Sequence, residues 1–381
     1  MLEKNLFNRV GYIDSLRGLA AMMVVFTHSW IVIPETYPAL FHQIVGEGAR
    51  GVQLFFIISA FTLFLSLEKL NYTGQKDLLL LYFIRRFFRI APLFYFAILI
   101  SLIFKYFLPH FDHLTIKNSF LDILTSITFT NGFFPTMFDS LVPNQWTISV
   151  EMLFYVFVPY LFIKVNTFKK SVRLYVVTSF ITLILSMLFI FAGKDNPHEW
   201  VNKIYFIIYT SFPFQLPNLL LGIVYFFVIK EGKSYKDVLG VLSWASIQTI
   251  IFGIYQKIIV NKFDISMISP RIQVETILFI LLIIFITKNN FPFINNKVMR
   301  YIGKISYGSY LLHFFVLVII GRLINSLELF NELSIYYKFI IMSTVCSIST
   351  IFIASITYKY IESPGQKLGL KVFNFLKNKQ P

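Results

Sequence analysis

Hydrophobic residues occur in long runs along this chain, and charged residues interrupt them mainly at their ends. A helix needs roughly 20 apolar residues to cross the hydrocarbon core of a bilayer, and ten runs approach that length. The pattern therefore predicts an all-α integral membrane protein with about ten transmembrane helices. These are expected near 16–33, 51–67, 88–108, 147–163, 174–192, 213–229, 238–256, 273–287, 305–325 and 339–357.

One region between the third and fourth runs departs from this pattern. Residues 109–145 are amphipathic, and Asp122 and Asn131 interrupt their apolar positions. A spanning helix rejects such groups unless they have partners inside the protein. We expect an interfacial or re-entrant piece here and no additional span.

Composition and charge agree with a membrane protein and exclude other classes. The chain has 381 residues, of which 56% are hydrophobic and 14% charged, and its mean hydropathy is +0.69. Soluble domains contain about 25% charged residues. The net charge of +15 is concentrated in alternate loops, which predicts that both termini are cytoplasmic. The charge then faces anionic lipid at the membrane edges, so we do not expect nucleic-acid binding.

The chain is expected to form one membrane domain, residues 1–358, followed by a basic amphipathic cytoplasmic tail, residues 359–381. Its single cysteine, Cys346, excludes an internal disulfide, and no zinc or haem spacing is present, so we expect no metal. The first run contains Arg17 and His28 and lacks a small-residue cleavage site, which favours a permanent anchor over a signal peptide.

Arg17 and His28 are candidate functional residues because both are ionisable and lie in the first span. They are eleven residues apart, which is about 16.5 Å and almost three turns of α-helix, so they share one face. A snorkelling arginine and a histidine that bonds a neighbouring helix remain the alternative.

A second basic cluster opens the third span from the cytoplasmic side. Arg86 and Arg89 are three residues apart and share a helix face. Such a cluster is often only the positive-inside signal. Together with Arg17, however, it predicts a mouth of three guanidinium groups, which suit bidentate binding of a phosphate-bearing cytosolic ligand.

Glu151 lies about five residues inside the fourth span, and His28 lies about as far from the outer end of the first. Both are therefore expected roughly 7 Å below the outer interface. A carboxylate at that depth is costly without a partner. We predict that Glu151 pairs with His28 and raises its basicity, as in a general base, although a purely structural polar network is the alternative.

Six fragments, in order along the chain, carry a family resemblance. They read IDSLRGLAAMMVVFTHSW, GVQLFFIISAFTLF, RRFFRIAPLFY, NQWTISVEMLFY, IGKISYGSYLLH and YKYIESPG. With these fragments the chain resembles the acyltransferase 3 family of integral membrane acyltransferases. The resemblance implies transfer of an acyl group, most often acetyl, from acyl-CoA to a hydroxyl of a cell-surface carbohydrate or envelope glycan.

The resemblance also implies roles for individual residues. His28 matches the catalytic histidine, and Glu151 matches the acidic position of the family. The residues linked to donor handling match Arg17, Arg86 and Arg89. Coenzyme would enter from the cytosol of a bacterial cell, and the glycan or lipid-linked saccharide would approach from the outer side of the plasma membrane. His28 would act as general base, and a covalent acyl-histidine intermediate stays open.

Further polar residues are candidates for substrate contacts. Gln53 stands where the family often has an acidic residue, so it is expected to bind acceptor without acting as an acid or base. Trp146 and Ser149 are also expected to bind substrate. Tyr307 and His313 of the ninth span either contact the donor or form a polar packing seam. The candidates for an oxyanion donor are Ser59, Asn144, Trp146 and Ser149.

Two other functions are compatible with ten spans and intramembrane charges. One is a flippase that transports a polysaccharide or lipid-linked glycan without making a bond, although transporters often contain repeated halves and none is visible here. The other is a non-catalytic membrane partner of a polysaccharide synthase.

Overall fold

The computed structural model describes residues 10–35, 37–72, 77–107, 119–134, 137, 139–192, 207–259, 271–289 and 291–378. Within these ranges the regular elements are helices. The longer ones are α2 (Val10–His28), α4 (Gly51–Tyr72), α5 (Leu78–Phe107), α7 (Trp146–Lys164), α8 (Phe168–Ala192), α10 (Phe212–Lys230), α11 (Tyr235–Ile259), α12 (Arg271–Asn289), α14 (Ser306–Asn325), α16 (Ile335–Thr357) and α17 (Ser363–Lys377). The shorter ones are α3 (Ala39–Gly46), α6 (Phe120–Ile127), α13 (Lys297–Lys304) and α15 (Glu328–Asn331).

Nine helical segments among the described residues are long and apolar enough to cross a membrane. The prediction of an all-helical multi-pass membrane protein is therefore confirmed. The count differs at the eighth predicted run, where the apolar helix in the described ranges covers only Gln273–Thr287. It is the apolar part of α12, whose 19 residues extend over about 28 Å.

The region predicted to lack a span contains only short helices where it is described. Residues 108–118, 135, 136 and 138 lie outside the described ranges. Asp122 does not face lipid, because it forms a capping box with Ser119 at the start of α6: each residue's backbone N–H donates to the other's side chain, at 3.2 Å. Asn131 accepts a hydrogen bond from Ser149 on α7. Both polar residues that interrupt the run thus have local partners.

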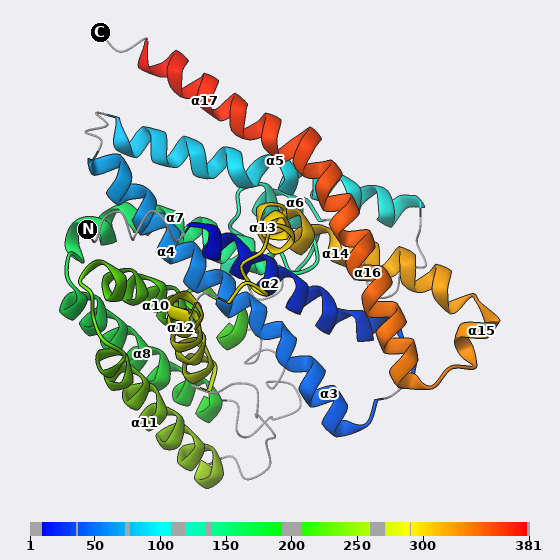
Figure 1. Cartoon of the computed structure of the whole chain (residues 1–381), viewed down its shortest axis with the longest axis horizontal. Coiled ribbons are helices and arrows are strands. Elements are labelled where there is room, and N and C mark those ends of the chain that lie inside the picture. The colour runs from blue at the N-terminus through cyan, green and yellow to red at the C-terminus, as the bar shows by residue number, and fades with distance from the viewer. Residues whose placement is uncertain are drawn as a thin grey trace.

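Helix α2 lies near the centre of the view, and α4 and α14 both pack against it (Figure 1). Helix α4 packs between α2 and α10, and α10 leads to α8, α11 and α12, which gather on one side. Helix α14 packs on α16 at the other side. Helix α17 continues from α16 and lies along α5 at the upper edge of the view.

Helix α13 crosses α2 at two glycines, and the contact is exceptionally close. A Cβ atom added to Gly303 would lie 1.6 Å from the backbone oxygen of Asp14, and one on Gly18 would lie 2.6 Å from that of Met299. Small residues of this kind let helix backbones approach within a membrane domain. The crossing fixes the position of α2 at Gly18, and Arg17 is the residue directly before it.

The predicted tail forms a helix in the structure. A π-helical turn, Tyr358–Glu362, joins α16 to α17. Gly365 and Gly369 of α17 face α5, where added Cβ atoms would lie 2.6 Å from Pro92 Cγ and 2.7 Å from Phe88 Cβ. Residues 379–381 lie outside the described ranges. The tail is thus attached to the helix that carries Arg86 and Arg89.

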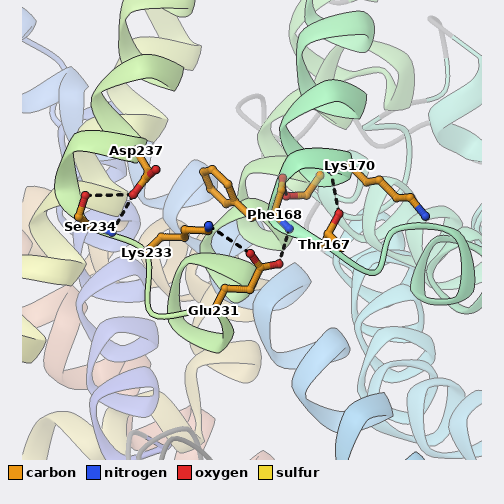
Figure 2. A network of polar contacts seen from close by, with 8 residues as sticks. Thr167, Phe168, Lys170, Glu231, Lys233, Ser234 and Asp237 are labelled. Atoms are coloured by element: carbon orange, nitrogen blue, oxygen red, sulfur yellow. Dashed lines mark hydrogen bonds and ion pairs between the residues drawn. The ribbon is translucent and has the colours of Figure 1, made fainter.

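Two connections at one end of the bundle are held together by a polar network (Figure 2). The backbone N–H of Phe168 donates to Glu231 Oε1 at 2.6 Å, and Lys233 Nζ lies 3.5 Å from Glu231 Oε2. A carboxylate at a helix N-terminus satisfies a free N–H and complements the helix dipole. Glu231 therefore fixes the start of α8 against the loop that follows α10.

Candidate active site

A pocket opens between α2, α4, α5, α7 and α14. Its walls combine apolar side chains with an unusual number of polar ones for the interior of a membrane domain. The polar lining residues are Arg17, Ser59, Arg89, Thr147, Glu151, Ser306, Tyr307 and Tyr310. Intramembrane ionisable groups of this kind mark functional sites by default, so this pocket is the candidate active site.

Two arginines give the pocket a positive character. Arg17 projects from the first half of α2, and its Nη2 donates to Thr62 Oγ1 on α4 at 3.3 Å. Arg89 enters from α5. Among the described residues that line the pocket, Glu151 is the only acidic one. The pocket therefore favours an anionic ligand.

Glu151 faces the pocket from α7, and two hydroxyl groups bond its carboxylate. Ser59 on α4 donates to Glu151 Oε1, and Tyr155 donates to the same oxygen at 2.6 Å. The predicted partner, His28, bonds a different residue, so the expected Glu–His pair is wrong. Glu151 lines the pocket together with Arg17, in the first half of α2, whereas His28 ends that helix and lies outside the described lining. Counting residues from the ends of two apolar runs therefore did not place the two side chains together.

The start of α7 is fixed by a buried carboxylate that precedes it. Asp139 accepts hydrogen bonds from the backbone N–H groups of Asn144, Gln145 and Trp146. Burial raises the pKa of Asp139 well above its usual range, against the opposing effect of these bonds. Asn144 adopts a left-handed conformation, with φ of 60°, which asparagine tolerates better than most residues. This turn sets the orientation from which Thr147 and Glu151 reach the pocket.

His28 is the last residue of α2, and its partner is His313 on α14. Nδ1 of His28 lies 2.9 Å from Nε2 of His313. The two rings are nearly parallel, at 15°, with centroids 5.1 Å apart, and the ring of Phe314 lies 4.8 Å from that of His28. His313 has no exposed surface. Two candidates that are far apart in the sequence thus form one histidine pair.

Helix α14 connects the pocket to this pair. Ser306, Tyr310 and His313 follow one another at spacings of four and three residues and share a helix face. Ser306 and Tyr310 line the pocket, and the ring of Tyr310 lies 5.8 Å from that of His313. His28 itself is not among the described lining residues, so the pocket ends about one helical turn from the histidine pair.

Four of the ten predicted site residues line the pocket: Arg17, Arg89, Glu151 and Tyr307. The hydroxyl of Tyr307 donates to the backbone oxygen of Ile90 on α5 at 2.8 Å. This bond ties α14 to the helix turn that carries Arg89.

The remaining predicted residues are packed into the bundle around the pocket. Gln53 is fully buried in α4. Trp146 is buried with its ring 5.3 Å from that of Tyr209, and Ser149 donates to Asn131. None of the three lines the pocket as described. Their predicted role in substrate binding stays a prediction.

Arg86 and Arg89 both lie on α5, but only Arg89 lines the pocket as described. The guanidinium carbon of Arg86 lies 5.8 Å from the ring centre of Tyr82 and 5.9 Å from that of Tyr155, which are distances typical of cation–π contacts. Arg86 is not among the described lining residues. Of the three arginines that were predicted to form one mouth, two therefore line this pocket, Arg17 and Arg89.

Tyr155 and Thr62, which bond Glu151 and Arg17, were not among the predicted site residues. Tyr155 follows Glu151 by four residues on the same helix, and that spacing places it on the same face. Thr62 carried no such signal, because its contact with Arg17 depends on how α4 packs against α2. Among the described residues, no group of three His, Cys, Asp or Glu side chains lies close enough to hold a metal.

A family profile described as "Acyltransferase domain" matches residues 10–359. The chain belongs to the acyltransferase 3 family. The matched range contains every residue of the pocket and the histidine pair, so the candidate site lies within the part of the chain that defines the family.

Individual relatives are O-acetyltransferases by name. The chain is 25% identical to O-acetyltransferase OatA of Staphylococcus aureus strain NCTC 8325 over 393 aligned residues, which cover 97% of this chain and 59% of that protein. It is also 25% identical to a putative O-acetyltransferase of strain COL, covering 95% of this chain and 58% of the relative. The chain therefore spans less than two thirds of the length of these relatives. No solved structure gave a significant match.

Proposed function

We propose that this membrane protein is an O-acyltransferase that transfers an acyl group, most simply acetyl, from acyl-CoA to a hydroxyl of an envelope glycan. The observation that carries the proposal is the pocket with two arginines at its wall and a histidine pair one helical turn beyond Tyr310. Family membership and the names of the relatives support acyl transfer to oxygen.

The donor is assigned from the charge and shape of the pocket. Acyl-CoA carries phosphates at one end and a thioester at the end of a long, thin arm. Arg17 and Arg89 would bind phosphate, because guanidinium groups bond phosphate oxygens with charge-assisted hydrogen bonds. The arm would then extend along the face of α14 that carries Ser306 and Tyr310 toward the histidine pair.

The chemistry assigned to His28 is general-base catalysis. An acceptor hydroxyl loses its proton to His28 as its oxygen attacks the thioester carbonyl, and the carbon–sulfur bond then breaks. The thiolate of CoA leaves and takes up the proton from His28, so protons and electron pairs balance. Base assistance of this kind accelerates a reaction about 100- to 10,000-fold.

The direction of the reaction across the membrane follows from the loop charges. With the start of α2 on the cytoplasmic side, acyl-CoA reaches the arginines from the cytosol and the acceptor approaches the end of α2 from outside. We place the protein in a bacterial plasma membrane. Its acceptor would be a surface polysaccharide or a lipid-linked saccharide.

Mass spectrometry of envelope glycans, with and without the intact gene, tests this function. We expect glycan ions that are heavier by acyl groups only when the gene is present, with equal amounts of glycan exported. If deletion stops export and leaves acylation of the retained glycan unchanged, the flippase alternative replaces the enzyme. If neither export nor acylation changes, the proposed function is wrong.

A further inference from the structure

We propose that His313 is a positioning residue that fixes His28 in the Nδ1-protonated tautomer, so that Nε2 of His28 is the atom that removes the acceptor's proton. The inference rests on the proposed role of His28 as a base. It goes beyond that role by naming the basic atom and the residue that selects it.

The tautomer of His313 follows from its backbone contact. Its Nδ1 is in hydrogen-bond contact with the carbonyl oxygen of Tyr310, one turn earlier on α14. A carbonyl oxygen can only accept, so Nδ1 of His313 carries the hydrogen. A neutral imidazole has a single N–H group, and Nε2 of His313 therefore presents a lone pair.

The tautomer of His28 follows in turn. Its Nδ1 lies 2.9 Å from that lone pair, so Nδ1 of His28 must donate. The nearly parallel rings and their centroid distance of 5.1 Å match a hydrogen bond that runs in the plane of both rings. Nδ1 of His28 thus carries its only hydrogen, and Nε2 is left unprotonated.

This chain of bonds, and not Glu151, raises the basicity of His28. That carboxylate is occupied by Ser59 and Tyr155. When Nε2 of His28 takes the acceptor's proton, the hydrogen on its Nδ1 can move to Nε2 of His313, and the positive charge is shared by two rings. The hydrogen returns when the thiolate is protonated, so the pair ends as it began.

Loss of His313 would change the tautomer of His28. A free imidazole prefers the hydrogen on Nε2, which places the lone pair on the wrong atom for catalysis. In the serine protease triad, the wrong histidine tautomer lowers kcat by about 10⁴-fold. We expect His313→Leu to lower acyl transfer by roughly 100- to 10,000-fold.

Three variants on α14 separate positioning from packing. His313→Leu removes the acceptor atom and keeps an apolar side chain. His313→Gln restores an amide oxygen close to the position of Nε2, so we expect it to recover at least one tenth of the activity of the original protein. Ser309→Ala is the matched control, since Ser309 is fully buried on the same helix and bonds only the backbone oxygen of Ile305.

The decisive readout is ¹⁵N NMR of the full-length protein with labelled histidine, in lipid nanodiscs, where the six histidines give few signals. Nitrogen shifts distinguish the two tautomers, and His28→Ala identifies the His28 signals. We expect the Nδ1–H form of His28 in the original protein, in His313→Gln and in Ser309→Ala, and the Nε2–H form in His313→Leu. An Nε2–H form in the original protein would overturn the inference, as would full activity of His313→Leu. If His313→Leu does not fold, the original protein and His313→Gln decide the matter.

These results are independent of the proposed function. If His28→Ala keeps full transferase activity while the original protein shows the Nδ1–H form, the role of His28 as base fails and the tautomer assignment stands. If His28→Ala is inactive and His313→Leu is fully active, the positioning role fails and the base stands.

Discussion

Replacing His28 by alanine should lower acyl transfer about 100- to 10,000-fold, with no loss of the folded protein. His28 sits at the end of α2, so its removal leaves the crossing of α2 and α13 at Gly18 and Gly303 intact. The arginines that line the pocket are also unchanged, and donor binding should persist. The measurement is the release of free CoA by membranes that contain the acceptor, at saturating acetyl-CoA.

His42→Ala is the matched control for this variant. His42 lies on α3 and packs its ring 4.7 Å from that of Trp30, away from the described lining of the pocket. The same chemical deletion should therefore leave the rate within a factor of about two. If His28→Ala retains more than one tenth of the rate, His28 is not the base, because base catalysis contributes at least about 100-fold.

Neutralising Arg17 or Arg89 should raise the acyl-CoA concentration needed for half-maximal rate by about 10- to 100-fold. A hydrogen bond to a charged group contributes about 1.5–3 kcal/mol, and each 1.4 kcal/mol is tenfold in affinity. The variants are Arg17→Gln and Arg89→Gln, and the measurement is the dependence of CoA release on acetyl-CoA concentration.

Arg86→Gln is the control that the structure supplies. Arg86 lies on the same helix as Arg89, but it packs between Tyr82 and Tyr155 outside the described pocket lining. We expect this variant to lower thermal stability and to leave donor saturation unchanged. Equal losses of donor affinity in Arg86→Gln and Arg89→Gln would show that the pocket is not the donor site.

The helices could be predicted from the sequence because a membrane span is apolar along its whole length. The same local reasoning found Arg17 and Arg89, since spacing along one helix defines a face. It failed for contacts between helices. His28 and His313 are 285 residues apart, and their pairing depends on how α2 packs against α14. The predicted contact between Glu151 and His28 failed for the same reason, because a residue count from the end of each run does not give the position of a side chain in the bundle.

The run at 273–287 shows a different limit of sequence patterns. Its residues form a helix as predicted, but the apolar pattern did not give the full extent of that helix, Arg271–Asn289. Similarly, Arg86 and Arg89 looked equivalent from their spacing. Two aromatic side chains from different helices, Tyr82 and Tyr155, separate their environments.

The central claim is that the donor reaches the arginine pocket from the side of the membrane that holds the start of α2. It is tested most directly with labelled acetyl-CoA, which does not cross a bilayer, added outside sealed membrane vesicles of either orientation. A cleavable N-terminal tag reports the orientation, and vesicles with His28→Ala give the background. We predict that label enters glycan only in vesicles that expose the N-terminus to the added donor. Equal labelling in both orientations, or labelling only in the opposite one, would contradict the account.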